Sequence, residues 1–125
     1  MPISDVHYGH PLFSQKHFLR TIEFIRRNAK VYTILNGDLI EAVTKASKGN
    51  IYKQTVEPKM QRKNITKMLE PIAKKILGSV QGNHEHRISE QASEDPSELI
   101  AEALGIPYRP SGMMLKISFG RGNEG

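Results

Sequence analysis

The chain of 125 residues contains no cysteine and no tryptophan, and none of its apolar runs is long enough to cross a membrane. The absence of cysteine excludes disulfides, thiolate metal ligands and thiol catalysis. A bilayer helix needs about 18 apolar residues in succession, so the sequence predicts no membrane partner. Residues 1–5 have neither the basic nor the apolar region of a secretory signal, which is compatible with a cytoplasmic protein.

The residues that are present are typical of a folded domain. Hydrophobic residues make up 38% of the chain and charged residues 25%, as in soluble globular proteins. The length fits one domain covering residues 1–125, or a piece of a larger one. The formal net charge of +5 indicates a polyanionic partner or substrate and says nothing about the fold.

The positive charge is concentrated in residues 45–75, the basic segment, which hold nine basic and two acidic residues. Its basic residues are Lys45, Lys48, Lys53, Lys59, Arg62, Lys63, Lys67, Lys74 and Lys75. One interpretation is a solvated helix face. The other is an electrostatic surface that recruits nucleic acid beside the site. Stacking on bases is not supported, because Tyr52 is the only aromatic residue in this segment.

Hydrophobic periodicity predicts an alternation of strands and helices. The predicted strands cover residues 1–4, 31–35, 76–80 and 114–119. The predicted helices cover residues 14–28, 59–69 and 95–104. Ser14 and Asp95 are expected N-caps, Gly105 ends the last helix, and Pro71 breaks the chain after the second. Together these elements predict an α/β fold with parallel neighbouring strands.

Polar clusters follow three of the predicted strands, and in parallel sheets such strand ends form the site. The clusters are Asp5-Val6-His7, Gly37-Asp38 and Gly82-Asn83-His84-Glu85. Asp5 and His7 are two residues apart, so on an extended segment their side chains share one side. A carboxylate and an imidazole presented together form a mixed ligand pair for Mn, Fe, Zn or Ni.

The other two clusters extend this donor set. The carboxylate of Asp38 can bridge two cations, Asn83 adds a neutral oxygen ligand, and His84 can reach a substrate as a proton donor. Two cations about 3.5–4 Å apart are the usual arrangement for displacement at a phosphate ester. The three clusters in this order therefore favour phosphoester chemistry.

The three clusters resemble the first three motifs of the calcineurin-like metallophosphoesterase superfamily. The surrounding residues, 3–10 and 80–87, are also similar to those of the small metallophosphoesterases of bacteriophages. The resemblance extends from residue 3 to about residue 119. It implies a partial four-layer αββα sandwich, with its C-terminal strands missing and with the site at the ends of the sheet strands.

The resemblance also implies a role for each motif residue. Asp5 and His7 would bind one metal ion, and Asp38 would bridge both ions. Asn83 would bind the second ion and contact the phosphate. His84 would stabilise the transition state or protonate the leaving group. Arg87, which follows the third motif, is a further candidate for binding the substrate phosphate through its forked guanidinium.

The implied reaction is hydrolysis of phosphomonoesters or phosphodiesters, including nucleotides or nucleic acid, by a metal-bound hydroxide that His84 assists. The implied cofactors are two divalent metal ions. Mn²⁺ is the default for the family, and Fe, Zn, Ni and Mg are alternatives. The expected location is the cytoplasm, which is the host cytoplasm if the protein is encoded by a phage.

The sequence departs from the family pattern after the third motif. No Gly-His-x-His motif occurs, and His86 is the only histidine after Glu85. The second metal ion would keep only Asp38 and Asn83 as protein ligands, which is too few for a tight site. Truncation at the C-terminus, and also at the N-terminus where four residues precede Asp5, is therefore expected. The alternatives are a non-catalytic module that binds phosphate or nucleic acid, and an inactive fragment.

Structural roles are expected for several other polar residues. His10 and His17 lie near the first motif and are expected to be solvated. Glu85 is expected to orient nearby groups and not to bind metal. For Arg87 the alternative to phosphate binding is an ion pair with Glu85 or Glu90.

Overall fold

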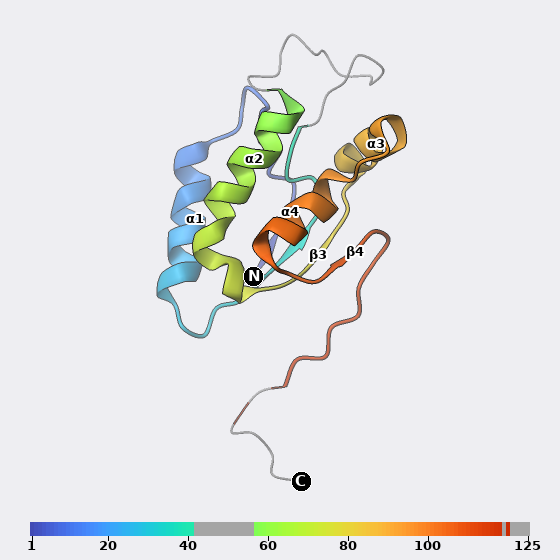
Figure 1. Ribbon diagram of the computed structural model, residues 1–125. Coiled ribbons are helices and arrows are strands. Elements are labelled where there is room, and N and C mark those ends of the chain that lie inside the picture. Colours follow the sequence, from blue (N-terminus) through green and yellow to red (C-terminus); the bar gives the residue numbers. More distant parts are fainter. Residues whose placement is uncertain (42–56, 119, 121–125) are drawn as a thin grey trace.

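The computed structural model describes residues 1–41, 57–118 and 120 of the chain (Figure 1). Its centre is a four-stranded sheet in the order β1-β2-β3-β4, in which all neighbouring strands are parallel. The strands are β1 (Pro2–Ile3), β2 (Thr33–Asn36), β3 (Ile76–Val80) and β4 (Tyr108–Arg109). This arrangement confirms the predicted α/β class with parallel neighbours.

The first helix, α1 (Gln15–Arg27), begins and ends where the sequence predicts. The side chain of Ser14 accepts a hydrogen bond from the backbone N–H of His17 at 3.4 Å, which is an N-cap contact. Phe18, Ile22 and Ile25 lie on one face at helical spacing and are buried. The N-cap and the spacing of the apolar residues, both visible in the sequence, are thus sufficient to predict this helix.

The second helix, α2 (Pro58–Leu69), passes directly into the 3-10 helix η2 (Glu70–Lys75). Pro71 occupies the start of η2, and the α-helix ends before it, as its ring requires. The strand β3 then begins at Ile76, so the predicted break and the predicted strand are both confirmed.

Two helices lie between β3 and β4. The helix α3 (Asn83–Ala92) is absent from the sequence-based expectations, and it begins inside the third motif. The helix α4 (Pro96–Leu104) is predicted correctly: the side chain of Asp95 accepts a hydrogen bond from the backbone N–H of Ser97 at 2.9 Å. Gly105 ends it with φ +66°, a conformation that suits glycine.

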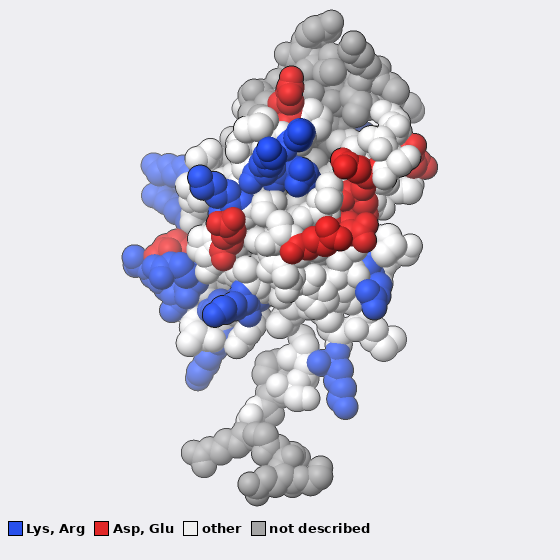
Figure 2. All heavy atoms as spheres, viewed as in Figure 1, with Lys and Arg blue, Asp and Glu red and all other residues white. Residues whose placement is uncertain are grey.

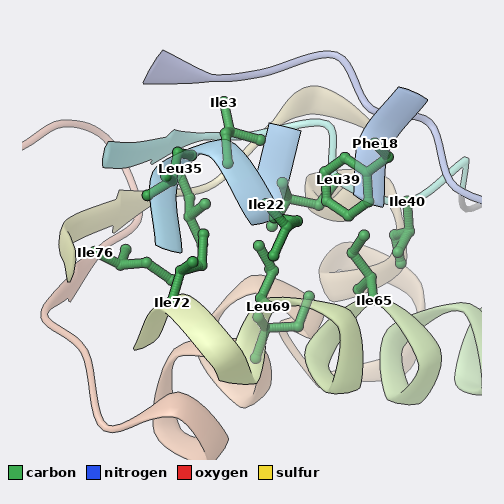
Figure 3. Close-up of a cluster of buried hydrophobic side chains, with 12 residues drawn as sticks. Ile3, Phe18, Ile22, Leu35, Leu39, Ile40, Ile65, Leu69, Ile72 and Ile76 are labelled. Carbon is green, nitrogen blue, oxygen red and sulfur yellow. The ribbon is translucent and has the colours of Figure 1, made fainter. Parts of the chain in front are cut away.

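One hydrophobic core joins the sheet to its helices (Figure 3). The strands contribute Ile3, Leu35 and Ile76, and the segment that follows β2 contributes Leu39 and Ile40. From the helical side come Phe18, Ile22, Ile25, Ile65, Leu69, Ile72 and Ile100. Because this core is continuous with the segment after β2, the loop that carries Asp38 is anchored directly to the packed interior.

The predicted strand at residues 114–119 is wrong over the part of it that the structure describes. Residues 114–118 have no strand conformation, and Met114 is 98% exposed; Phe119 lies outside the described residues. The edge of β3 is paired with β4 instead, through Ser79 and Val80. Alternation of polar and apolar residues at 114–118 therefore does not produce a strand, because among the described residues no strand pairs with this segment.

The basic segment is described only from Glu57 onward, and the part before it lies outside the described residues. Figure 2 shows basic side chains gathered over α1 and α2, and acidic side chains gathered on the side of α4. Lys75 has a structural role, since its ammonium donates hydrogen bonds to the carbonyl oxygens of Ile25 (2.6 Å) and Asn28 at the end of α1. Among the described helices, none combines the length and the hydropathy that a membrane span requires.

Candidate metal centre

The three motifs meet at one edge of the sheet because β1, β2 and β3 are parallel. Beyond the strands, the pairing between the first two motifs continues. The backbone N–H of His7 donates to the carbonyl of Asp38, and that of Tyr8 donates to the carbonyl of Leu39, both at 3.0 Å. These bonds hold the first motif directly against the second.

Three residues of the site have left-handed backbone conformations. Asp5 has φ +53°, His7 has φ +48° and Asp38 has φ +51°. Such values are uncommon for residues with a side chain and cost about 1 kcal/mol or more each. The surrounding hydrogen bonds and packing stabilise these conformations, which turn the side chains of the first two motifs out of the strand direction.

Two glycines allow the second and third motifs to approach each other. A Cβ on Gly82 would lie 2.1 Å from the backbone nitrogen of Asp38 and 2.4 Å from its Oδ1. A Cβ on Gly37, which has φ +78°, would lie 2.5 Å from the Cα of Gly82. A side chain at either position is therefore incompatible with the observed geometry.

Asp5, His7 and Asp38 form a group whose donor atoms all lie within 4.8 Å of one another. Nε2 of His7 lies 4.0 Å from Oδ1 of Asp5. The side chain of Asp5 is 71% exposed, so this group opens to solvent. The hydroxyl of Ser4 donates to the other oxygen of Asp5 and orients that carboxylate.

Asn83 lies against the carboxylate of Asp38. The atom of its side-chain amide that faces Asp38 is 2.8 Å from Oδ2 and 3.3 Å from Oδ1. With the nitrogen turned to Asp38, these contacts are hydrogen bonds. With the oxygen turned to Asp38, two acceptors face each other, an arrangement that needs a cation between them. The position of Asn83 therefore suits either a hydrogen bond or a shared cation.

His84 is held at two points. Its backbone N–H donates to Oδ1 of Asp38 at 3.0 Å, and its Nδ1 lies 2.5 Å from the carbonyl oxygen of Glu41. A carbonyl oxygen only accepts, so Nδ1 of His84 bears the hydrogen and Nε2 is left for other partners. The ring stacks edge-on against that of His7, with centroids 4.5 Å apart.

Glu85 is fully buried and binds the loop of the second motif. Its carboxylate accepts hydrogen bonds from the backbone N–H groups of Asp38 (3.0 Å), Leu39 (2.7 Å) and Ile40 (3.1 Å). Burial raises the pKa of Glu85, and the backbone hydrogen bonds oppose that rise. The geometry agrees with the structural role expected from the sequence.

No protein-family model matches the chain, and a search of curated proteins finds no match. The family resemblance therefore remains a prediction that rests on the three motifs and their order.

The sequence-based reasoning missed Glu41. Oε2 of Glu41 lies 3.1 Å from Nδ1 of His7, and its side chain is only 14% exposed. His7, Glu41 and His84 form a second group whose donor atoms lie within 4.8 Å of one another. The available signal was a carboxylate three residues after Asp38, but only the pairing of the two segments places it beside His7.

Three further residues singled out in the sequence, Arg87, His10 and His17, are not part of the two ligand groups. Within the described part of the chain, the guanidinium of Arg87 forms neither a hydrogen bond nor the ion pair with Glu85 or Glu90 that the sequence offered as an alternative. Glu90 pairs instead with His86, at 3.2 Å. Nδ1 of His10 accepts a hydrogen bond from the backbone N–H of Leu12, and His17 is exposed on α1.

Proposed function

We propose that the protein is a metal-dependent phosphoesterase whose site consists of Asp5, His7, Asp38, Asn83 and His84. The observation that carries the proposal is the convergence of three motifs, from three parallel strand ends, into one cluster of nitrogen and oxygen donors. In this proposal the sheet and its helices are part of a four-layer αββα sandwich.

The donor set fits divalent cations. Carboxylate, imidazole and amide oxygen together suit Mn²⁺, and also Fe, Zn, Ni or Mg²⁺. Asp5, His7 and Asp38 would hold one ion, and Asp38 and Asn83 would hold a second. Adjacent ligands of one ion at bonds of about 2.1 Å lie about 3 Å apart. The 2.8 Å contact between Asn83 and Asp38 is close to that value.

When bound, such ions would activate a water molecule and stabilise the charge that develops on the phosphoryl oxygens. The protein residues then have to orient the substrate and supply a proton. Because Nδ1 of His84 donates to the carbonyl of Glu41, Nε2 is the atom that can exchange a proton with the leaving group. The second contact of His84, to Asp38, fixes this imidazole relative to the ligand group.

The start of α3 supports a phosphate site at the same edge. Asn83 and His84 are the first residues of this helix, and the N-terminus of a helix carries partial positive charge. Arg87 follows one turn later and is half-buried. We propose that Asn83 and Arg87 contact the phosphate of the substrate, Asn83 directly and Arg87 through its forked guanidinium.

A second candidate function is binding of phosphate or nucleic acid without catalysis. The sequence favours it because the motifs leave only Asp38 and Asn83 for the second ion. The basic side chains over α1 and α2 would then attract a polyanion (Figure 2). Such binding would weaken steeply with salt, whereas an affinity that does not change with salt would rule it out.

Hydrolysis of bis-p-nitrophenyl phosphate with Mn²⁺ tests the proposed function. His84→Ala is expected to lower the rate at least 100-fold, because general acid–base groups typically contribute about 10²–10⁴-fold. Asp38→Asn is expected to lower the rate because it removes the carboxylate that both ions would share. His17→Ala, on the exposed face of α1, is the matched control and should leave the rate unchanged. A wild-type rate that neither site substitution reduces would refute the assignment. Mn²⁺ binding without turnover would favour the binding module.

A further inference from the structure

The ring nitrogen Nδ1 of His7 is buried, and the carboxylate of Glu41 lies close to it. Among the described residues, it forms no hydrogen bond of regular geometry. Oε2 of Glu41 is nevertheless 3.1 Å away, which is a hydrogen-bond distance. A small rotation of either side chain would complete the bond. The two atoms are therefore separated by a donor–acceptor distance, and Nδ1 of His7 is shielded from solvent.

The other ring nitrogen of His7 faces the proposed ligands, since Nε2 lies 4.0 Å from Asp5. An imidazole that binds a cation through one nitrogen carries its hydrogen on the other, and that hydrogen usually binds a carboxylate or a carbonyl. For His7 the hydrogen must then be on Nδ1. Leaving that buried N–H without an acceptor would be unfavourable, and Glu41 supplies the acceptor.

We propose that Glu41 is a positioning residue that accepts the hydrogen of Nδ1 of His7 and thereby presents Nε2 to a divalent cation. The part of this inference that concerns the cation rests on the proposed function. The part that concerns the tautomer of His7 does not, because it follows from the two side chains alone.

The backbone of Glu41 is fixed on both sides. Its N–H donates to the carbonyl of Tyr8 at 3.0 Å, and its carbonyl accepts from Nδ1 of His84. Glu41 thus orients His7 through its side chain and His84 through its main chain. Substitution of the side chain alone should therefore change the tautomer of His7 and leave the hydrogen of His84 on Nδ1, because the main-chain carbonyl of residue 41 is retained. The ring of His17, exposed on α1, gives the experiment an internal reference.

A direct bond between Glu41 and the cation is the competing arrangement, since the donor atoms of His7, Glu41 and His84 also lie close together. In that arrangement Nδ1 of His7 would itself be a ligand. Hydrogen bonding is favoured because Nδ1 is shielded from solvent, whereas Nε2 is on the side of the exposed Asp5. The two arrangements differ in which ring nitrogen bears the hydrogen, and this can be measured.

The test is nitrogen NMR of the histidine rings in the metal-free protein above the pH at which imidazoles titrate. The wild type is expected to show His7 with its hydrogen on Nδ1. In Glu41→Ala, the hydrogen of His7 should move wholly or partly to Nε2, while His84 keeps its hydrogen on Nδ1 and His17 stays unchanged. Glu41→Gln should retain the wild-type tautomer, because its amide oxygen can still accept. Glu90→Ala removes an exposed carboxylate from His86 and is the matched control.

Titration with Mn²⁺ supplies the second readout. Loss of a carboxylate that orients a ligating histidine typically weakens metal binding about 10–100-fold, which is the decrease expected for Glu41→Ala. Glu41→Gln should restore most of it, and Glu90→Ala should have no effect.

Three results would overturn the inference. They are a wild-type His7 with its hydrogen on Nε2, an identical tautomer in wild type and Glu41→Ala, and a Zn²⁺-loaded protein whose metal is bound through Nδ1. A wild type that binds no divalent cation would instead defeat the proposed function. The tautomer comparison would still decide the role of Glu41, and the wild-type spectrum decides it even if Glu41→Ala does not fold.

Discussion

Glu85→Ala is expected to destabilise the protein strongly, because the carboxylate is the acceptor for three backbone N–H groups. Each of these groups would be left in a buried position without a partner, at a cost of about 1–3 kcal/mol. Water entering the space left by the side chain would recover part of that cost, so a total of about 3–5 kcal/mol is expected. This loss is a large fraction of the stability of an ordinary domain.

Urea denaturation followed by circular dichroism measures the effect. A loss of this size should lower the midpoint by about 2 M, because small proteins lose about 1–3 kcal/mol of stability per molar urea. Glu85→Gln should be intermediate, since its amide keeps one acceptor oxygen and turns an NH₂ group toward a backbone donor. Glu102→Ala, on the exposed side of α4, is the control and should change stability by about 0.5 kcal/mol or less. If Glu85→Ala behaves like this control, the reasoning about the buried carboxylate is refuted.

Two further substitutions test the site and its support. Gly82→Ala should destabilise the protein by about 2–3 kcal/mol and weaken Mn²⁺ binding more than tenfold, because the new Cβ would collide with the backbone of Asp38. Urea denaturation measures the first effect and Mn²⁺ titration the second. Gly112→Ala, where a Cβ would meet no other atom within 4 Å, should change neither stability nor Mn²⁺ affinity. Lys75→Met should cost about 1–3 kcal/mol in the same denaturation assay, since it removes the charged donor at the end of α1. Equal effects of Lys75→Met and of Lys74→Met, its exposed neighbour, would contradict that role.

The elements that could be predicted are those whose signals are local. Ser14, the buried positions of α1, Pro71 and Asp95 each act within a few residues of the chain, so a sequence pattern contains all of their information. The convergence of the three motifs could also be predicted. It depends only on strands being parallel and on polar residues following them.

The helix α3 could not be predicted from hydrophobic periodicity, because its buried residue is a carboxylate. Glu85 is the inward-facing position, and its partners are backbone groups about 45 residues away in the sequence. The helix also begins after Gly82, which has no side chain that could serve as a cap. The wrong strand prediction has the opposite cause, since residues 114–118 alternate between polar and apolar side chains but pair with no strand among the described residues.

The four carboxylates of the site differ in what surrounds their oxygen atoms. This difference separates the proposed metal ligands from the carboxylates that hold other groups in place. Both oxygens of Glu85 accept hydrogen bonds from backbone N–H groups, and the side chain is fully buried, so its carboxylate serves the loop of the second motif and not a cation. Glu41 is nearly buried, and its Oε2 lies 3.1 Å from the shielded nitrogen of His7. Asp5 keeps an exposed oxygen, and Asp38 turns one toward Asn83. From the sequence, Asp5 and Asp38 were already expected as ligands and Glu85 as an orienting residue, but Glu41 was missed, because only the pairing of the two segments places it beside His7. The full division arises from the parallel pairing that buries the loop of the second motif between the first and the third. The expected order of effects follows: substitution of Glu85 should act mainly on stability, Glu41 on metal affinity through His7, and Asp5 or Asp38 on metal binding directly.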